Sequence, residues 1–262
     1  MSIIDFILLV IGGIAAGGIN TLAGNGSAIT LMLLETMGLP ITIANGTNRV
    51  GVLFQSIIAV GTFQQSGKLE KALTESKWLI IPIVGSALIG AYCASILSNE
   101  EMKAVVKWLM LVLLIVILLK PKRWLRETAV SINRKTVLNY LLFIGVGFYA
   151  GFIQMGMGVI FLAVMVLAAK YSLIDSNIIK VLVVLLLTIP VLILFVWQGQ
   201  VNWYFGLIVA IGQGLGAWLA ARFAIQNENA TVWIRRLLIV VVIMAIIKLF
   251  FGAYIMDMIM IQ

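Results

Sequence analysis

Long uninterrupted apolar runs separated by short polar breaks dominate the chain. Residues 109–119, 181–196 and 237–247 are clear examples. The runs are continuous rather than alternating, which predicts helices and not the alternating strands of a membrane barrel. About 20 apolar residues suffice to cross the hydrocarbon core of a bilayer, where only helices and closed barrels satisfy every backbone group. The pattern therefore predicts an all-α, polytopic membrane protein.

Glycines interrupt the first apolar region of each half of the chain. Regions 3–36 and 137–170 are too long for one ordinary span. Each predicts two shorter helices with an unwound junction, at residues 20–27 and 154–158. Three full spans are expected after each region, at 43–64, 77–97 and 102–119 in the first half and at 175–197, 202–222 and 231–251 in the second.

The two halves resemble each other, as in transporters built from duplicated repeats. Residues 13–20 match residues 147–154 in Gly, Ala, Gly, Ile and a terminal side-chain amide. Further matches follow in the same order, pairing Gly24 and Gly26 with Gly156 and Gly158, 48–50 with 179–181, and 90–92 with 216–218. We therefore divide the chain into a first transmembrane repeat, 1–119, a basic cytoplasmic linker, 120–136, and a second transmembrane repeat, 137–262.

The orientation of the repeats depends on whether each broken region crosses the membrane. Basic residues gather on the cytoplasmic side, where the basic linker is expected to lie. If each broken region is a re-entrant hairpin, the repeats are inverted and only Lys103, Lys107 and Lys248 lie outside. If each crosses once, the repeats are parallel and six basic residues lie outside. The charge pattern favours inverted repeats with both termini outside, and a single broken span in each repeat stays the alternative.

The composition of the chain limits the classes of function that it can support. The chain is 63% hydrophobic and only 11% charged, whereas soluble domains carry about a quarter charged residues. Topology explains the net charge of +8 better than a nucleic-acid partner does. The chain has no histidine and one cysteine, Cys93, which leaves no support for a disulfide, a metal site or histidine acid–base catalysis. We expect no cofactor and no enzymatic activity.

Unwound backbone inside a bilayer must be buried in protein or line a cavity. The segment 20–27 would place the amino end of the following helix at mid-depth, where free N–H groups and the helix dipole attract an anion. Gly156 and Gly158 would do the same from the second half. The alternative is that glycines merely permit close helix packing, which we favour for Gly12, Gly13, Gly17 and Gly18.

Two basic residues enter spans. Arg49 follows the polar start 45–48 of one span, and Lys180 follows residues 175–177 at the start of its counterpart. A cation inside a span usually faces a cavity or a partner, and these two could attract an anion from both halves. Snorkelling to the interface is the alternative. The predicted substrate-binding residues are Asn20, Asn25, Gly26, Ser27, Asn48, Arg49, Gln154, Gly156, Gly158, Asn177 and Lys180.

Other polar residues within the apolar regions receive lesser roles. Thr30, Gln55 and Gln213 are further polar residues that could line a pathway. The acids Glu35 and Asp175 are the candidates for a proton carrier, and we favour a structural role for each.

The first half carries a motif that resembles a known family. A glycine-rich helix precedes Asn-x-x-Ala-Gly-x-Gly-Ser at 20–27, followed by Leu39-Pro40 and by Ala-Asn-Gly-Thr-Asn at 44–48. This arrangement resembles the sulfite exporter TauE/SafE family of membrane permeases over nearly the whole chain. The copy in the second half is eroded at 176–179. The resemblance implies transport of sulfite, of sulfonates such as sulfoacetate, or of related organic anions.

Together these observations predict a secondary transporter of a small organic or sulfur-containing anion, working by alternating access, with export favoured. A passive anion channel and an intramembrane enzyme are the alternatives. The expected partners are a small anionic substrate and the lipid bilayer, with no nucleic acid, and the expected location is the plasma or inner membrane, crossed several times. The oligomeric state stays open, a homodimer included, as do the substrate, the direction of transport and the coupling ion.

Overall fold

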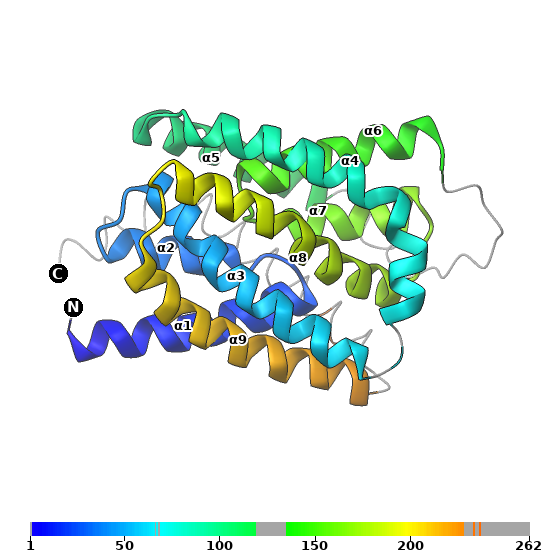
Figure 1. Ribbon diagram of the computed structural model, residues 1–262, viewed down its shortest axis with the longest axis horizontal. Helices are drawn as coiled ribbons and strands as arrows, with labels where there is room; N and C mark the ends of the chain where they lie inside the picture. Colours follow the sequence, from blue (N-terminus) through cyan, green and yellow to red (C-terminus); the bar gives the residue numbers. More distant parts are fainter. Residues whose placement is uncertain are drawn as a thin grey trace.

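The computed structural model describes residues 2–65, 67, 69–118, 135–227, 233 and 236, and every regular element in these residues is a helix (Figure 1). The predicted linker up to residue 134 and nearly all of the predicted last span, 231–251, lie outside the described residues. The helices of the first half are α1 (Ile3–Leu22), α2 (Ser27–Thr36), α3 (Ile41–Gln64), α4 (Leu69–Ser95) and α5 (Asn99–Leu118). Those of the second are α6 (Val137–Phe152), α7 (Met157–Ala163), the π-helical turn η2 (Val164–Ala168), α8 (Leu173–Trp197) and α9 (Trp203–Gln226).

Four of the described helices are long and apolar enough to cross a membrane. They are α1, the segment Ser76–Ser95 of α4, α8 and α9. Many large apolar side chains on these helices are exposed, including Ile81, which is 81% exposed, and Ile193. An exposed apolar surface of this kind is stable in lipid and not in water, so the chain is an integral membrane protein.

Both predicted helix breaks are present and shorter than expected. The first covers residues 23–26, because Asn20 to Leu22 remain helical and the amides of Ala23 and Gly24 both donate to the carbonyl of Ile19. The second covers residues 153–156. Gly24 and Gly156 turn the chain with φ angles of +84° and +75°, a conformation that residues with a Cβ rarely adopt.

Helix α2 folds back along α1. A Cβ at Gly26 would collide with the backbone of Ala16, and a Cβ at Gly12 would collide with the side chain of Leu33. The later residue of α2 thus lies beside the earlier residue of α1, which is the pairing of an antiparallel hairpin. Figure 1 shows α1 running away from the N-terminus and α2 returning toward it.

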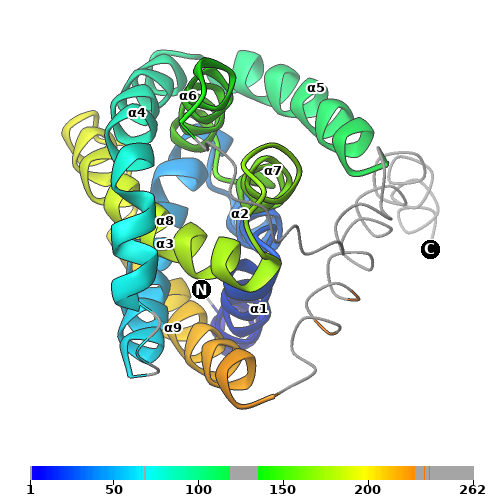
Figure 2. The same cartoon turned by 90° about the vertical axis from the view of Figure 1, so that its right-hand side faces the viewer.

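The helices of the two halves interlock. Helix α1 packs against α9, and its counterpart α6 packs against α4, as Figure 2 shows. Close packing explains the predicted glycines, since Gly13 and Gly17 face the backbone of α9 around Gln213, whereas Gly147 and Gly151 face the backbone of α4. The preference for a packing role is therefore confirmed at Gly13 and Gly17. A Cβ at Gly12 would instead meet the side chain of Leu33, and one at Gly18 would meet the backbone of Gly216 only at an ordinary contact distance.

The counterpart helices α3 and α8 run antiparallel. The start of α3 lies at the end of α8, because the guanidinium of Arg49 stacks over the ring of Phe195 with its carbon 5.7 Å from the ring centroid. The amide of Asn202, just after α8, donates to the hydroxyl of Thr47 at 2.9 Å. Hence the turn between α8 and α9 lies at the same end of the molecule as the start of α3.

Candidate substrate site

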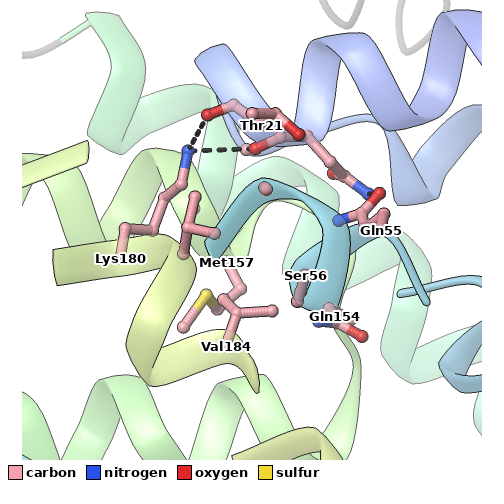
Figure 3. Close-up of a pocket in the computed structure, with 12 residues that line it drawn as sticks. Thr21, Gln55, Ser56, Gln154, Met157, Lys180 and Val184 are labelled. Carbon is pink, nitrogen blue, oxygen red and sulfur yellow. Dashed lines mark hydrogen bonds between the residues drawn. The ribbon is translucent and has the colours of Figure 1, made fainter. Parts of the chain in front are cut away.

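A small cavity lies where the two helix breaks meet, in the middle of the helix assembly (Figure 3). The end of α1, the middle of α3, the second break, the start of α7 and the first half of α8 enclose it. Its lining residues are Asn20, Thr21, Gly24, Gln55, Ser56, Ala59, Gln154, Met157, Gly158, Lys180, Val181 and Val184.

The first break touches the start of α7, next to the second break, through glycine. The amide of Gly158 donates to the carbonyl of Gly24 at 3.1 Å. A Cβ on either residue would collide with the backbone of the other. Only a pair of glycines allows the breaks to approach this closely, and the approach puts both at the cavity wall.

Lys180 brings a positive charge to the cavity. Its side chain is buried, and its ammonium donates to the carbonyls of Asn20 at 2.9 Å and Thr21 at 3.1 Å and to Oδ1 of Asn177 at 2.7 Å. Figure 3 shows the side chain pointing from α8 toward the end of α1. All three hydrogens of the ammonium therefore have neutral oxygen partners.

Arg49 makes the corresponding contacts in the other half. It does not line the cavity itself, but it bonds to Gln154, which does. Its guanidinium donates to the carbonyl of Ala150 at 2.7 Å, to that of Gly151 at 2.8 Å and to Oε1 of Gln154 at 3.1 Å. Asn45, one turn earlier on α3, donates to the carbonyl of Phe152 at 2.9 Å. Both side chains thus hold the last turn of α6.

Each cation caps the broken helix of the opposite half of the chain. The last carbonyls of a helix have no partner within the helix and carry the negative end of its dipole, so a cation there is stabilising. Arg49 from the first half caps α6, and Lys180 from the second half caps α1. Their exposed fractions are 0% and 1%, which rules out snorkelling for both.

The amino end of α2 is engaged by acceptors from its own chain. Oδ1 of Asn20 accepts from the amide of Ser27 at 3.2 Å, and the amide group of the same side chain donates to the Ser27 hydroxyl. The next three amides bond to the carbonyls of Asn25 and Gly26. The N–H groups that the sequence analysis assigned to an anion therefore already have partners, because Asn20 acts as the cap.

A second polar cluster joins α2, α3 and α9. The side-chain amide of Gln213 donates to the Thr30 hydroxyl at 2.8 Å and to Oδ1 of Asn48 at 3.3 Å. The unpaired atoms Nδ2 of Asn48 and Oε1 of Gln213 are buried in the same cluster. These residues hold helices together and do not line the cavity.

The structure brings four predicted site residues to the cavity. They are Asn20, Gln154, Gly158 and Lys180. Asn177 lies behind Lys180 as its hydrogen-bond partner. The remaining predicted residues, Asn25, Gly26, Ser27, Asn48, Arg49 and Gly156, do not line it.

Two polar lining residues are not among the residues predicted from the sequence. Thr21 and Ser56 both face the cavity. The signal for Ser56 is present in the sequence, because it lies seven residues after Arg49 and next to Gln55, and positions two turns apart share a face of a helix. Thr21 lies inside the predicted break 20–27, but no pattern distinguishes it from the other residues of that segment.

The cavity is small, about 20 Å³, which is room for about one water molecule. Its wall carries one ammonium together with amides and hydroxyls, and no carboxylate. Within the described part of the chain, no group of three or more histidines, cysteines or acids could hold a metal ion. Donor groups without a negative charge can surround a small anion.

Taken together, apolar helices, paired helix breaks and a central polar cavity define a polytopic helical membrane protein of the transporter class. The family model described as Sulfite exporter TauE/SafE matches residues 9–249. The chain belongs to this family.

Relatives with transporter names align with most of the chain. It is 27% identical over 241 residues to "Probable membrane transporter protein ORF9" of Sinorhizobium sp, covering 92% of this chain and 90% of the relative. It is 24% identical to "Probable membrane transporter protein YfcA" of Escherichia coli K12, covering 91% and 87%. A "Probable membrane transporter protein" of Haemophilus influenzae Rd is 25% identical, covering 84% and 85%. No solved structure matches the chain significantly.

Proposed function

We propose that this protein is a secondary transporter of a small organic or sulfur-containing anion, such as sulfite or a sulfonate, and that it works by alternating access. One observation carries the proposal: Lys180 lines a cavity between two broken helices, with no carboxylate among the lining residues. Half-helices that end at mid-membrane around a polar cavity are typical of substrate sites in transporters.

The contacts of Lys180 suggest how a bound anion would change the contact between α1 and α8. The ammonium bonds to the carbonyls of Asn20 and Thr21, at the end of α1. A sulfonate or carboxylate is charged and competes with these neutral carbonyls for the same donors. Binding would therefore weaken the clamp between α1 and α8, and the two repeats would become freer to move relative to each other.

We propose that the repeats, 1–119 and 137–262 with the cytoplasmic linker 120–136 between them, are inverted. The antiparallel course of α3 and α8 and the hairpin of α1 and α2 support this arrangement. Rocking of inverted repeats about a fixed central site opens that site to each side in turn. The proposed setting is the plasma or inner membrane, with a homodimer as one oligomeric state.

Uptake into proteoliposomes tests the function. The purified protein should give saturable uptake of at least one anion from a panel of sulfite, sulfoacetate, taurine and simple carboxylates. The same anion preloaded inside should accelerate uptake, because a carrier returns faster with substrate bound. A flux that rises linearly with concentration and ignores internal anion would indicate a channel, and no flux for the whole panel would overturn the proposal.

A further inference from the structure

Both helix ends that could hold a coupling cation are already filled by side chains. In transporters with broken helices, the carboxyl ends of half-helices and their free carbonyls coordinate the coupling Na⁺ or H⁺. Here the Lys180 ammonium takes this position at the end of α1, at 2.9 and 3.1 Å from two carbonyl oxygens. The Arg49 guanidinium takes the equivalent position at the end of α6, at 2.7 and 2.8 Å.

The two tethered cations differ in one respect that matters for coupling. A guanidinium keeps its proton at all accessible pH values, whereas an ammonium releases its proton when its surroundings favour the neutral amine. Lys180 also lines the cavity, whereas Arg49 does not. Lys180 is therefore the one of these two cations that lies beside the cavity.

Lys180 has no acidic partner within the described residues. Its hydrogen-bond acceptors are two carbonyls and the amide of Asn177. The other titratable or charged groups on α8 and on the helices packed against it are Asp175 on α8, Asp5 on α1, Arg49 on α3, Glu70, Lys71, Glu75, Lys77, Tyr92 and Cys93 on α4, and Tyr140 and Tyr149 on α6. None of those whose side chains the structure describes lines the cavity. An anion in the cavity would thus be the negative charge nearest to the ammonium along the cavity wall.

We propose that Lys180 carries the proton that couples this protein to the proton gradient, in symport with the anion. This inference rests on the proposed transport function. An anion in the cavity stabilises the ammonium over the amine, and by thermodynamic linkage the protonated lysine binds the anion more tightly by the same factor. The proton enters from the side where the anion binds and leaves with it on the other side. Na⁺ has no role, because both half-helix ends hold side-chain cations.

The test uses sulfoacetate and proteoliposomes in which the membrane potential is clamped at zero. Wild-type protein should accumulate sulfoacetate toward the alkaline side, by up to about tenfold for one pH unit, since one pH unit is a tenfold ratio of proton activity. Replacing all Na⁺ by choline should leave the accumulation unchanged. A requirement for Na⁺, or sulfoacetate exchange without any accumulation, would overturn the inference.

Lys180→Arg supplies the decisive variant, because it keeps the positive charge and cannot release the proton. This variant should lose accumulation driven by the pH gradient, and any sulfoacetate exchange that it retains should not respond to pH. Arg222→Lys, a control at an exposed position on α9 that does not line the cavity, should accumulate sulfoacetate as wild type does. Accumulation by Lys180→Arg at the wild-type level would refute the role of Lys180.

If Lys180→Arg does not fold, the wild-type response to pH and Na⁺ decides whether the inference holds. Absence of sulfoacetate exchange in wild-type protein that transports no anion of the panel would instead remove the proposed function, and the inference with it.

Discussion

Arg49 and Lys180 show how a charge becomes acceptable inside a membrane protein. Each is buried, and each places its donors on carbonyls at the end of a helix that has no further turn to receive them. The helix ends need donors and the cations need acceptors, so each satisfies the other. The Nε atom of Arg49 is the one part of this guanidinium that lacks a partner.

Truncation of Arg49 should therefore destabilise the protein strongly. Arg49→Ala leaves the carbonyls of Ala150 and Gly151 buried without a donor, and each unsatisfied group costs about 1–3 kcal/mol. We expect a loss of about 3 kcal/mol or more, seen as a lower midpoint of thermal unfolding in detergent. Arg49→Lys should lose less, because an ammonium still reaches part of the same carbonyls.

The control is Arg222→Ala, which removes an arginine from an exposed position on α9. Surface substitutions of this kind usually change stability by less than about 0.5 kcal/mol. Equal unfolding midpoints for Arg49→Ala and Arg222→Ala would contradict the capping role.

The sequence predicted that these two residues are counterparts, but not what they bind. Their equivalence follows from their positions just after the polar starts of two matching spans. Their partners lie 101 residues away from Arg49 and 160 residues away from Lys180. Such contacts depend on the packing of the opposite repeat, which no local pattern encodes.

At the scale of elements, the breaks depend on glycine in two different ways. Gly24 needs its positive φ angle of +84°, and both Gly24 and Gly158 need the missing Cβ to approach each other. The sequence located both breaks. It placed the start of the first break too early, because the side chain of Asn20 folds back to cap α2 while its own backbone stays helical, and it placed the end one residue too late.

Alanine at either contact glycine should disturb the junction. We expect Gly24→Ala and Gly158→Ala each to lower the unfolding midpoint and to reduce uptake, because the new methyl group collides with the facing backbone. Gly85→Ala on α4 is the matched control, since a Cβ there meets nothing within 4 Å. It should be neutral or stabilising by up to about 1 kcal/mol, as alanine is the better helix former. Similar losses at all three positions would show that the contact between the breaks has no special role.

At the scale of the whole molecule, the proposal of inverted repeats rests on the charge count and on the course of two helices. Inverted repeats leave three basic residues outside, whereas parallel repeats would leave six there. The antiparallel course of α3 and α8 also supports the inverted arrangement. The interlocking of the halves, with α1 on α9 and α6 on α4, was not predictable. The glycines that permit it predict a close approach between helices, but they do not show which helix approaches.

Thiol labelling tests the inverted topology. Gln65 and Gln198 occupy matching exposed positions after α3 and α8. In a Cys93→Ala background, a membrane-impermeant reagent should label Gln198→Cys from outside intact cells and Gln65→Cys only after the membrane is opened. Labelling of both residues from the same side would show that the repeats are parallel.

We propose that the transported anion occupies the cavity at the meeting of the two breaks. Ser56 lines this cavity from α3, and a Ser56→Cys substitution exchanges one oxygen for sulfur. In the Cys93→Ala background, we predict that a small water-soluble thiol reagent modifies Ser56→Cys and that saturating sulfoacetate slows this modification several-fold, while modification of Gln65→Cys is unaffected. An unchanged rate at Ser56→Cys, in protein that transports sulfoacetate, would place the anion elsewhere and contradict the account.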